Sequence, residues 1–474
     1  MRRIAFVGLL GLSGCMVGPN YHKPQLALPG AYKAAPGWVK AQPADAAPKG
    51  AWWLAFGDPV LDKLEPQVAV NNATLAADYY AYQQAVALAQ ETRGSLFPTL
   101  GLTGSATRTG GGGSSSGPIT TGTFAGQAAW SLDLWGKIRR QVQSEVANAQ
   151  ASAADLANAT LSAQAALASD YVNLRIADAN AVLLRQTVAA YQASLRIAQN
   201  KYAAGTVSQS DVITAQTQLD GAQSSLVAEG AVRAQYEHAI AVLTGHAPAE
   251  LSIPEGTLIA AIPVAPPQVP STLLERRPDI AAAERQMAAQ NALIGAAVAA
   301  YYPDLSLSAL GGFSANPITG LFNTSNALWS LGTTASEDIF EGGVRGQAVT
   351  AAKAGYLESV ETYRQTVLTS FQDVEDDLSN LQIYAQQAQV QDRAVADASR
   401  AAQIALNEYR DGTADYTTVV TAQVTLLSDR QIALSIQQSR LLASIALYQD
   451  LGGGFTESDL PTSGQIQSKL PFAP

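Results

Sequence analysis

The chain contains two copies of one unit, displaced by about 205 residues. Phe97-Pro98 recurs as Tyr302-Pro303, and Asp133-Leu134-Trp135-Gly136 recurs as Asp338-Ile339-Phe340 followed by Gly342-Gly343. Further along, Tyr202 with Gly205-Thr206 recurs as Tyr409 with Gly412-Thr413, at an offset only two residues larger. A proline-rich segment from Pro248 to Pro270 separates the copies and predicts a linker. The fold therefore has an internal two-fold repeat, with the same order of elements in each half.

Each copy contains one helix that is too long for an ordinary globular domain. Residues 136–200 and 343–407 form runs without proline, each of which predicts a rod of about 98 Å. The helix that follows each rod has a heptad pattern, which indicates coiled-coil packing. Its positions are Val212, Leu219, Leu226, Arg233 and Ile240 in the first copy, and Val419, Leu426, Ala433, Arg440 and Leu447 in the second.

Two nearly uncharged segments precede the long helices. Residues 94–132 contain only Arg108 as a charged residue, and residues 305–336 contain none. Apolar residues alternate with small polar ones, which predicts two strands within about 98–133 and two within about 303–338. A half-buried sheet of a soluble protein has the same alternation. The lack of charge, together with the N-terminal export signal described below, favours strands that span a membrane with one face toward lipid.

Four strands are too few to close a barrel. An open sheet edge in hydrocarbon leaves unpaired N–H and C=O groups, so the chain must oligomerise. Two copies would give eight strands with a filled interior, whereas three copies would give twelve strands and a lumen. The long helices continue directly from the strands, so barrel and rods share one axis.

The N-terminus has the pattern of a lipoprotein signal. Arg2 and Arg3 precede a short apolar stretch, which ends in Leu12-Ser13-Gly14-Cys15. Cleavage after residue 14 would leave Cys15 as a lipid-carrying N-terminus, and Met16 rather than Asp after it implies sorting to the outer membrane. The alternative is a secretory signal that happens to contain the only cysteine of the chain.

Composition excludes several functions. A net charge of −10 disfavours nucleic acid as a partner. Three His and one Cys are too few for a zinc site, an iron–sulfur site or a disulfide framework, so we expect no metal and no cofactor besides the lipid on Cys15. Residues Gly113 to Gly117 match G-x-S-x-G, but they lie in a low-complexity segment without the strand and helix that a nucleophile elbow needs. We therefore expect that the protein is not an enzyme.

Several motifs together resemble the outer membrane factors, and specifically the efflux lipoproteins of the NodT type. They are the segment from Cys15 to Pro24, Trp52-Trp53 with Asp58-Pro59, Arg276-Arg277-Pro278-Asp279-Ile280, and Ile294-Gly295. The resemblance implies an α+β membrane protein: a homotrimer with a twelve-stranded barrel, a periplasmic coiled-coil tunnel and an equatorial belt. It divides the chain into a signal (1–14), an N-terminal lipidated segment (15–58), the first repeat (59–245), a linker (246–270), the second repeat (271–452) and a C-terminal tail (453–474).

The same resemblance implies the function of an exit channel. The channel would carry drugs and small toxic compounds passively across the outer membrane, and its partners would be a periplasmic adaptor and an inner-membrane pump of the resistance-nodulation-division type. The chain has no P-loop motif, so energy must come from the pump. The alternatives are an exit duct for type I protein secretion and a coiled-coil scaffold without a pore.

In the family, two hairpin tips close the periplasmic end and meet the adaptor. By motif these tips are Tyr202 to Gln216 and Tyr409 to Gln423, with Gly205, Thr206, Gly412 and Thr413 at the adaptor contact. Thr418 and Thr421 stand at the aperture positions where relatives often carry an acidic ring, and Asp411, Asp415 and Tyr416 are the further candidates for the aperture. The alternative for these last residues is that Asp415 caps a helix and Tyr416 packs between neighbours.

Overall fold

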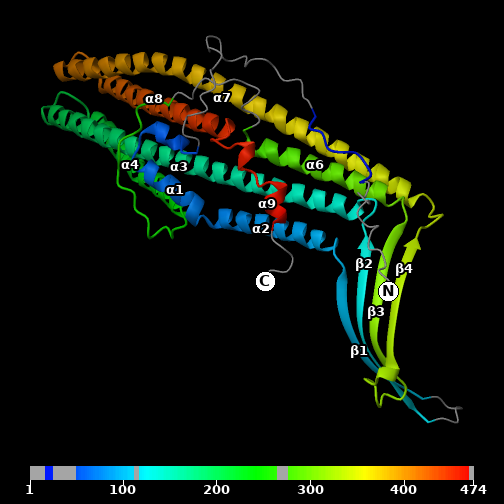
Figure 1. The fold of residues 1–474 in the computed structure, drawn as a ribbon. Helices are drawn as coiled ribbons and strands as arrows, with labels where there is room; N and C mark the ends of the chain where they lie inside the picture. The colour runs from blue at the N-terminus through cyan, green and yellow to red at the C-terminus, as the bar shows by residue number, and fades with distance from the viewer. Residues whose placement is uncertain (1–15, 25–49, 111–116, 264–275, 469–474) are drawn as a thin grey trace.

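The computed structural model describes residues 16–24, 50–110, 117–263 and 276–468 (Figure 1). Cys15, the signal segment before it and residues 113–116 lie outside the described residues, and so do residues 264–270 of the linker.

Both halves of the chain share the order helix, two strands, long helix and returning helix, and each adds short elements of its own. The first half has 3-10 helix η1 (Trp52–Phe56), helices α1 (Leu61–Asn71) and α2 (Ala73–Gly94), strands β1 (Thr99–Thr109) and β2 (Ile119–Leu132), and helices α3 (Lys137–Ala203) and α4 (Gln209–Leu243). The second half has α6 (Pro278–Ala299), β3 (Asp304–Ala315), η2 (Thr324–Asn326), β4 (Ala327–Ser336), α7 (Val344–Asp411), α8 (Tyr416–Asp450), η3 (Glu457–Asp459) and α9 (Ser463–Gln467).

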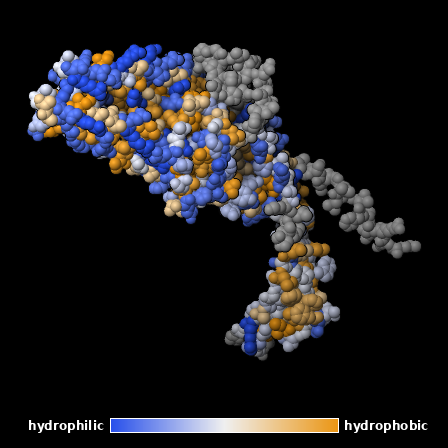
Figure 2. Space-filling model, turned by 90° about the vertical axis from the view of Figure 1, so that its left-hand side faces the viewer, coloured by the Kyte–Doolittle hydropathy of each residue, from blue (hydrophilic) through white to orange (hydrophobic). Residues whose placement is uncertain are grey.

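The four strands form one antiparallel sheet in the order β1-β2-β3-β4. Its register places apolar or small residues opposite one another on one face, as in the row of Leu100, Ala128, Ala309 and Leu331. The sheet projects from one end of the helical body without a helix on either face (Figure 1). Hydrophobic side chains gather over it, whereas the helical body shows a mixed surface (Figure 2). The alternation in the sequence therefore corresponds to one apolar face that the protomer leaves uncovered.

The two long helices are the dominant elements of the body. Helix α3 has 67 residues and α7 has 68, so each is about 100 Å long. Each begins directly after a left-handed glycine, Gly136 with φ 81° or Gly343 with φ 87°, which turns the chain from strand to helix. Helix α4 packs along α3 and α8 along α7, while α6 lies against both long helices (Figure 1).

The largest core lies midway along the body. It joins η1, α1, α3, α8 and the linker through buried residues that include Trp52, Leu61, Tyr171, Ile253 and Leu441. Segments from both halves of the chain thus meet in one core. Among the described residues, none of the helices combines the length and the apolar character that crossing a bilayer requires.

Candidate functional site

The two hairpin tips lie at the end of the body opposite the sheet (Figure 1). Gly205 and Gly412 both have left-handed backbones, with φ 75° and 78°. In each tip the next threonine satisfies a free carbonyl of the preceding helix. The Thr206 amide and hydroxyl both donate to the Lys201 carbonyl at 3.0 Å, and those of Thr413 donate to the Glu408 carbonyl at 2.9 and 3.1 Å. The repeated Gly-Thr pair is therefore a helix-ending motif that shapes both tips alike.

A buried cluster holds the two hairpins together just behind the tips. The rings of Tyr409 and Tyr416 lie 5.1 Å apart and are both nearly fully buried. Their buried partners come from all four hairpin helices: Tyr191, Leu195, Ala198, Ala215, Leu219, Ala222, Ala405 and Val419. Lys201 places its ammonium 5.0 Å from the centre of the Tyr409 ring, at cation–π distance. The cluster therefore couples the position of one tip to that of the other.

Polar contacts add to this coupling. The Gln423 amide donates a hydrogen bond of 2.9 Å to the Ser194 hydroxyl, which joins α8 to α3 inside the buried region.

Burial, followed by the negative charge of Asp211, raises the pKa of Tyr409 to about 12. Tyr409 therefore stays neutral at physiological pH and keeps its hydroxyl proton.

The structure separates the five predicted aperture residues into two groups. Asp411, Asp415, Thr418 and Thr421 are exposed at the second tip, whereas Tyr416 faces the buried cluster. Asp415 is the residue before α8, but its side chain makes no capping hydrogen bond. Within the protomer Tyr416 thus has a packing role, and the exposed aspartates lie at the tip of the second hairpin beside the exposed Arg410.

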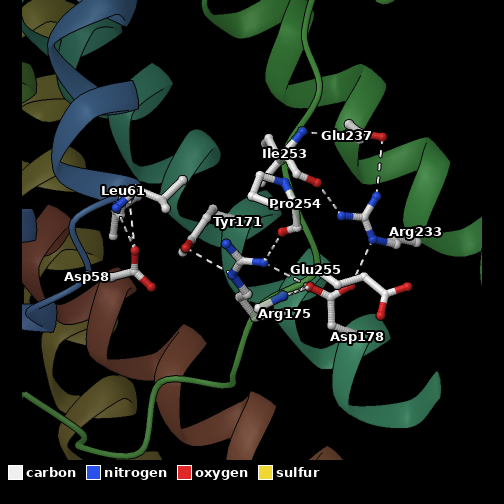
Figure 3. Close-up of polar contacts among 12 residues, drawn as sticks. Asp58, Leu61, Tyr171, Arg175, Asp178, Arg233, Glu237, Ile253, Pro254 and Glu255 are labelled. Carbon is white, nitrogen blue, oxygen red and sulfur yellow. Dashed lines mark hydrogen bonds and ion pairs between the residues drawn. The ribbon is translucent and has the colours of Figure 1, made fainter. Parts of the chain in front are cut away.

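A buried ion cluster fastens the linker to the first hairpin (Figure 3). Asp178 of α3 forms two ion pairs, one with Arg175 at 2.8 Å and one with Arg233 of α4 at 2.7 Å. Both arginines also hold linker backbone, since Arg175 donates to the Pro254 carbonyl at 2.9 Å and Arg233 donates to that of Ile253. Arg233 is one of the charged heptad positions of the sequence, and its charge at a core position is the signal that a buried partner must exist.

The linker continues from this cluster to the second hairpin. Gln437 of α8 donates to the Ile259 carbonyl at 3.2 Å, and Ser444 donates to the Pro263 carbonyl at 3.1 Å. Periodicity in the sequence cannot reveal such contacts, because they pair single side chains with backbone far away in the chain. The linker therefore ties the two hairpins together midway along the body.

The residues that follow Cys15 are bound at the start of α3. Arg140 of α3 is almost fully buried and donates to the carbonyls of Val17 and Gly18 and to the Asn20 side chain, each at 3.1 Å. Gly18 has φ 88° and lies so close to Gly295 that a Cβ would come within 2.4 Å of its Cα. The segment is thus fixed at the point where β2 becomes α3.

A two-repeat α+β chain in which an antiparallel sheet continues into paired helical hairpins is the arrangement of one class of outer membrane channels. The structure of the outer-membrane channel OprN superimposes on this chain with a TM-score of 0.85 and 28% identity, over 93% of this chain and 99% of OprN. The chain belongs to the outer membrane efflux protein family, whose model matches residues 64–246 and 269–453. It is therefore an outer-membrane component of an efflux system.

Relatives with related names match along nearly the whole chain. The probable efflux pump outer membrane protein TtgC of Pseudomonas putida is 29% identical, over 97% of each chain. The cation efflux system protein CusC of Escherichia coli O6:H1 is 27% identical, over 96% of this chain and 99% of CusC. The similarity therefore includes the sheet, both hairpins and the linker.

Proposed function

We propose that three copies of the chain close into one channel, which crosses the outer membrane and continues as a tunnel into the periplasm. The observation that carries the proposal is the pair of unpaired edges, β1 and β4, on a sheet with an uncovered apolar face. In hydrocarbon each unpaired backbone group costs several kcal/mol. Pairing β4 of one copy with β1 of the next removes every edge, and three copies give a barrel of twelve strands with an open lumen.

The channel is a passive conduit, and the hairpin tips are its periplasmic gate. The tips lie farthest from the sheet, and the cluster of Tyr409 and Tyr416 couples them within each protomer. Asp411 and Asp415 are exposed at the second tip, where three copies would form a ring of negative charge. Opening then requires the hairpins to move apart, and the protein performs no chemical step.

The lipid anchor belongs beside the barrel. Residues Val17 to Asn20 are held by Arg140 at the junction of β2 and α3, so a lipid on Cys15 would start at the membrane-facing end of the helices. Fatty-acid labelling tests this: the wild type should incorporate label and Cys15→Ala should not. Label retained on Cys15→Ala would refute the lipid.

The partners are a periplasmic adaptor and an inner-membrane pump of the resistance-nodulation-division type, which supplies the energy. Relatives whose names describe efflux pumps for toluene and for cations support an efflux role, and the compounds would be small and toxic. A photo-crosslinker at the exposed Thr413 of the second tip should capture the adaptor in cells. The same group at the exposed Ser458 serves as the control, because its neighbour Glu457 pairs with Arg285 of α6 and not with a tip.

Mass and conductance together test the channel itself. The detergent-purified protein should have the mass of three chains and should conduct ions across a planar bilayer. A stable monomer without current would contradict the proposal and would favour a scaffold without a pore.

A further inference from the structure

One arginine at the start of α6 gathers carboxylates from three helices. Arg277 is largely buried and pairs with Asp279 of its own helix at 2.9 Å and with Asp450 of α8 at 2.9 Å. It also lies 3.7 Å from Asp373 of α7. The charge of Arg277 thus faces three negative ones at the point where α6, α7 and α8 meet.

A fourth carboxyl, that of Asp377, is more deeply buried. Among the described ion pairs, none joins it to Arg277. Asp377 is one turn after Asp373 on α7, is 9% exposed, and lies beside the carboxyl of Asp450. Its Oδ2 is buried without a hydrogen-bond partner among the described residues. The surrounding contact between α7 and α8 is apolar, through Val374, Leu378 and Leu447. Two carboxyls therefore meet in a place with little water to separate their charges.

The charges that face this pair do not balance it. Helix α6 contributes Arg277 and Asp279, and Arg276 lies just before it; α7 adds Asp373 and Asp376, and α8 adds Asp450 itself. Burial, and then the charge of Asp450, raises the pKa of Asp377 to about 8. Burial also raises the pKa of Asp450, although Arg277 acts in the opposite direction.

We propose that Asp377 and Asp450 share one proton, and that the protonated pair is a latch which holds the middle of α7 against the last turn of α8 and the start of α6. With the proton present, one carboxyl donates to the other and only one negative charge stays near Arg277. When the proton leaves, two carboxylates repel each other inside an apolar contact. The junction that supports the second hairpin then loosens. The inference needs only the folded chain and is independent of whether that chain forms a channel.

The substitution Asp377→Asn isolates the proton, because asparagine is a neutral copy of the protonated carboxyl. The side chain of Asp377 has a raised pKa in the folded state, so its stabilising effect is complete at low pH and is lost as the pH rises through about 8. We therefore expect the thermal midpoint of the full-length wild type to fall relative to that of Asp377→Asn between about pH 5 and pH 8, and the two curves to run parallel above.

The matched control is Asp392→Asn, since it removes the same kind of charge from an exposed position farther along α7. Its midpoint should follow that of the wild type at every pH. Parallel curves for the wild type and Asp377→Asn would overturn the proposal.

Hydrogen exchange of the wild type gives a second measurement that does not depend on a variant. After correction for the intrinsic exchange rate, amides around Val374 to Leu378 and Leu447 to Leu451 should lose protection as the pH rises from about 5 to about 8, and no more above that. Amides of α4 in the first hairpin, which has no such pair, are the internal reference. Equal behaviour of both regions would also overturn the latch.

Discussion

At the scale of single residues, burial decides which ion pairs stabilise the protein. Arg175 and Arg185 both lie on α3 and both contact the linker, but the pair of Arg175 with Asp178 is buried whereas that of Arg185 with Glu255 is about half exposed. Arg175→Ala leaves a buried carboxylate with fewer partners and should lower the free energy of unfolding by about 3 kcal/mol. Arg185→Ala should cost less than about 1 kcal/mol. Denaturant unfolding measures both changes in free energy, and equal losses for the two variants would contradict a stabilising role of the buried ion cluster.

The burial of the Glu65 carboxyl should destabilise the folded chain. Glu65 is fully buried in α1, both its carboxyl oxygens are without hydrogen-bond partners among the described residues, and burial raises its pKa to about 9. Glu65→Leu should therefore raise the free energy of unfolding by about 1–3 kcal/mol near neutral pH.

The gain from Glu65→Leu should depend on pH. The folded wild type keeps the proton that the unfolded chain releases, so the wild type loses stability as the pH rises toward about 9 while the leucine variant does not. The gap between them should widen over that range. Glu91→Leu, at an exposed position of α2, is the control and should show no such gap. A gap for Glu65→Leu that stays constant with pH would mean that the carboxyl is ionised in the folded state.

At the scale of elements, the two hairpins should behave as one gate because their helices share a buried cluster. Tyr416→Ala removes a ring that packs on Tyr409 and leaves a cavity behind the tips. We expect higher conductance of the isolated channel, and a further increase when Asp415→Ala is added. The exposed Ser458→Ala, outside both tips, should leave the conductance unchanged. If all three variants conduct like the wild type, the constriction lies elsewhere.

The elements are also the scale at which the sequence predicts best. The proline-free runs predicted helices at 136–200 and 343–407, and the structure has them at Lys137–Ala203 and Val344–Asp411. Alternation predicted the strands, because a face of small and apolar residues has a period of two. Helical and strand periods are local properties, so they can be read from a single sequence.

The contacts between elements were not predictable in the same way. The sequence marked Arg233 as an exception to the heptad pattern, but nothing in it pointed to Asp178 or to the Ile253 carbonyl. Arg140 gave no signal at all, since its partners are backbone carbonyls of a segment more than a hundred residues away. For Tyr416 the sequence left two alternatives, a place at the aperture or packing between neighbours, and the structure shows its ring packed in the buried cluster of four helices.

At the scale of the whole molecule, the proposed channel requires one face of the sheet to contact lipid and the other to line the lumen. Leu331 and Ser330 are neighbours on β4 and both are exposed in the single chain, but they point to opposite faces. Leu331 belongs to the apolar row that also contains Leu100, Ala128 and Ala309, whereas Ser330 lies on the face with the small polar residues of β1 and β2. In a soluble protein an arginine at either position would meet water and be tolerated equally.

A transmembrane barrel makes the two positions differ. Leu331→Arg would place a charge near the middle of the lipid-facing band, at a cost of about 2–4 kcal/mol per copy that three copies multiply. We expect this variant to fail to assemble in the outer membrane. Ser330→Arg would face the aqueous lumen, so it should assemble normally and conduct cations less well, because each copy adds a positive charge to the same ring. Membrane fractionation and bilayer conductance of the two variants measure these outcomes. Normal assembly of both would mean that the apolar face does not contact lipid.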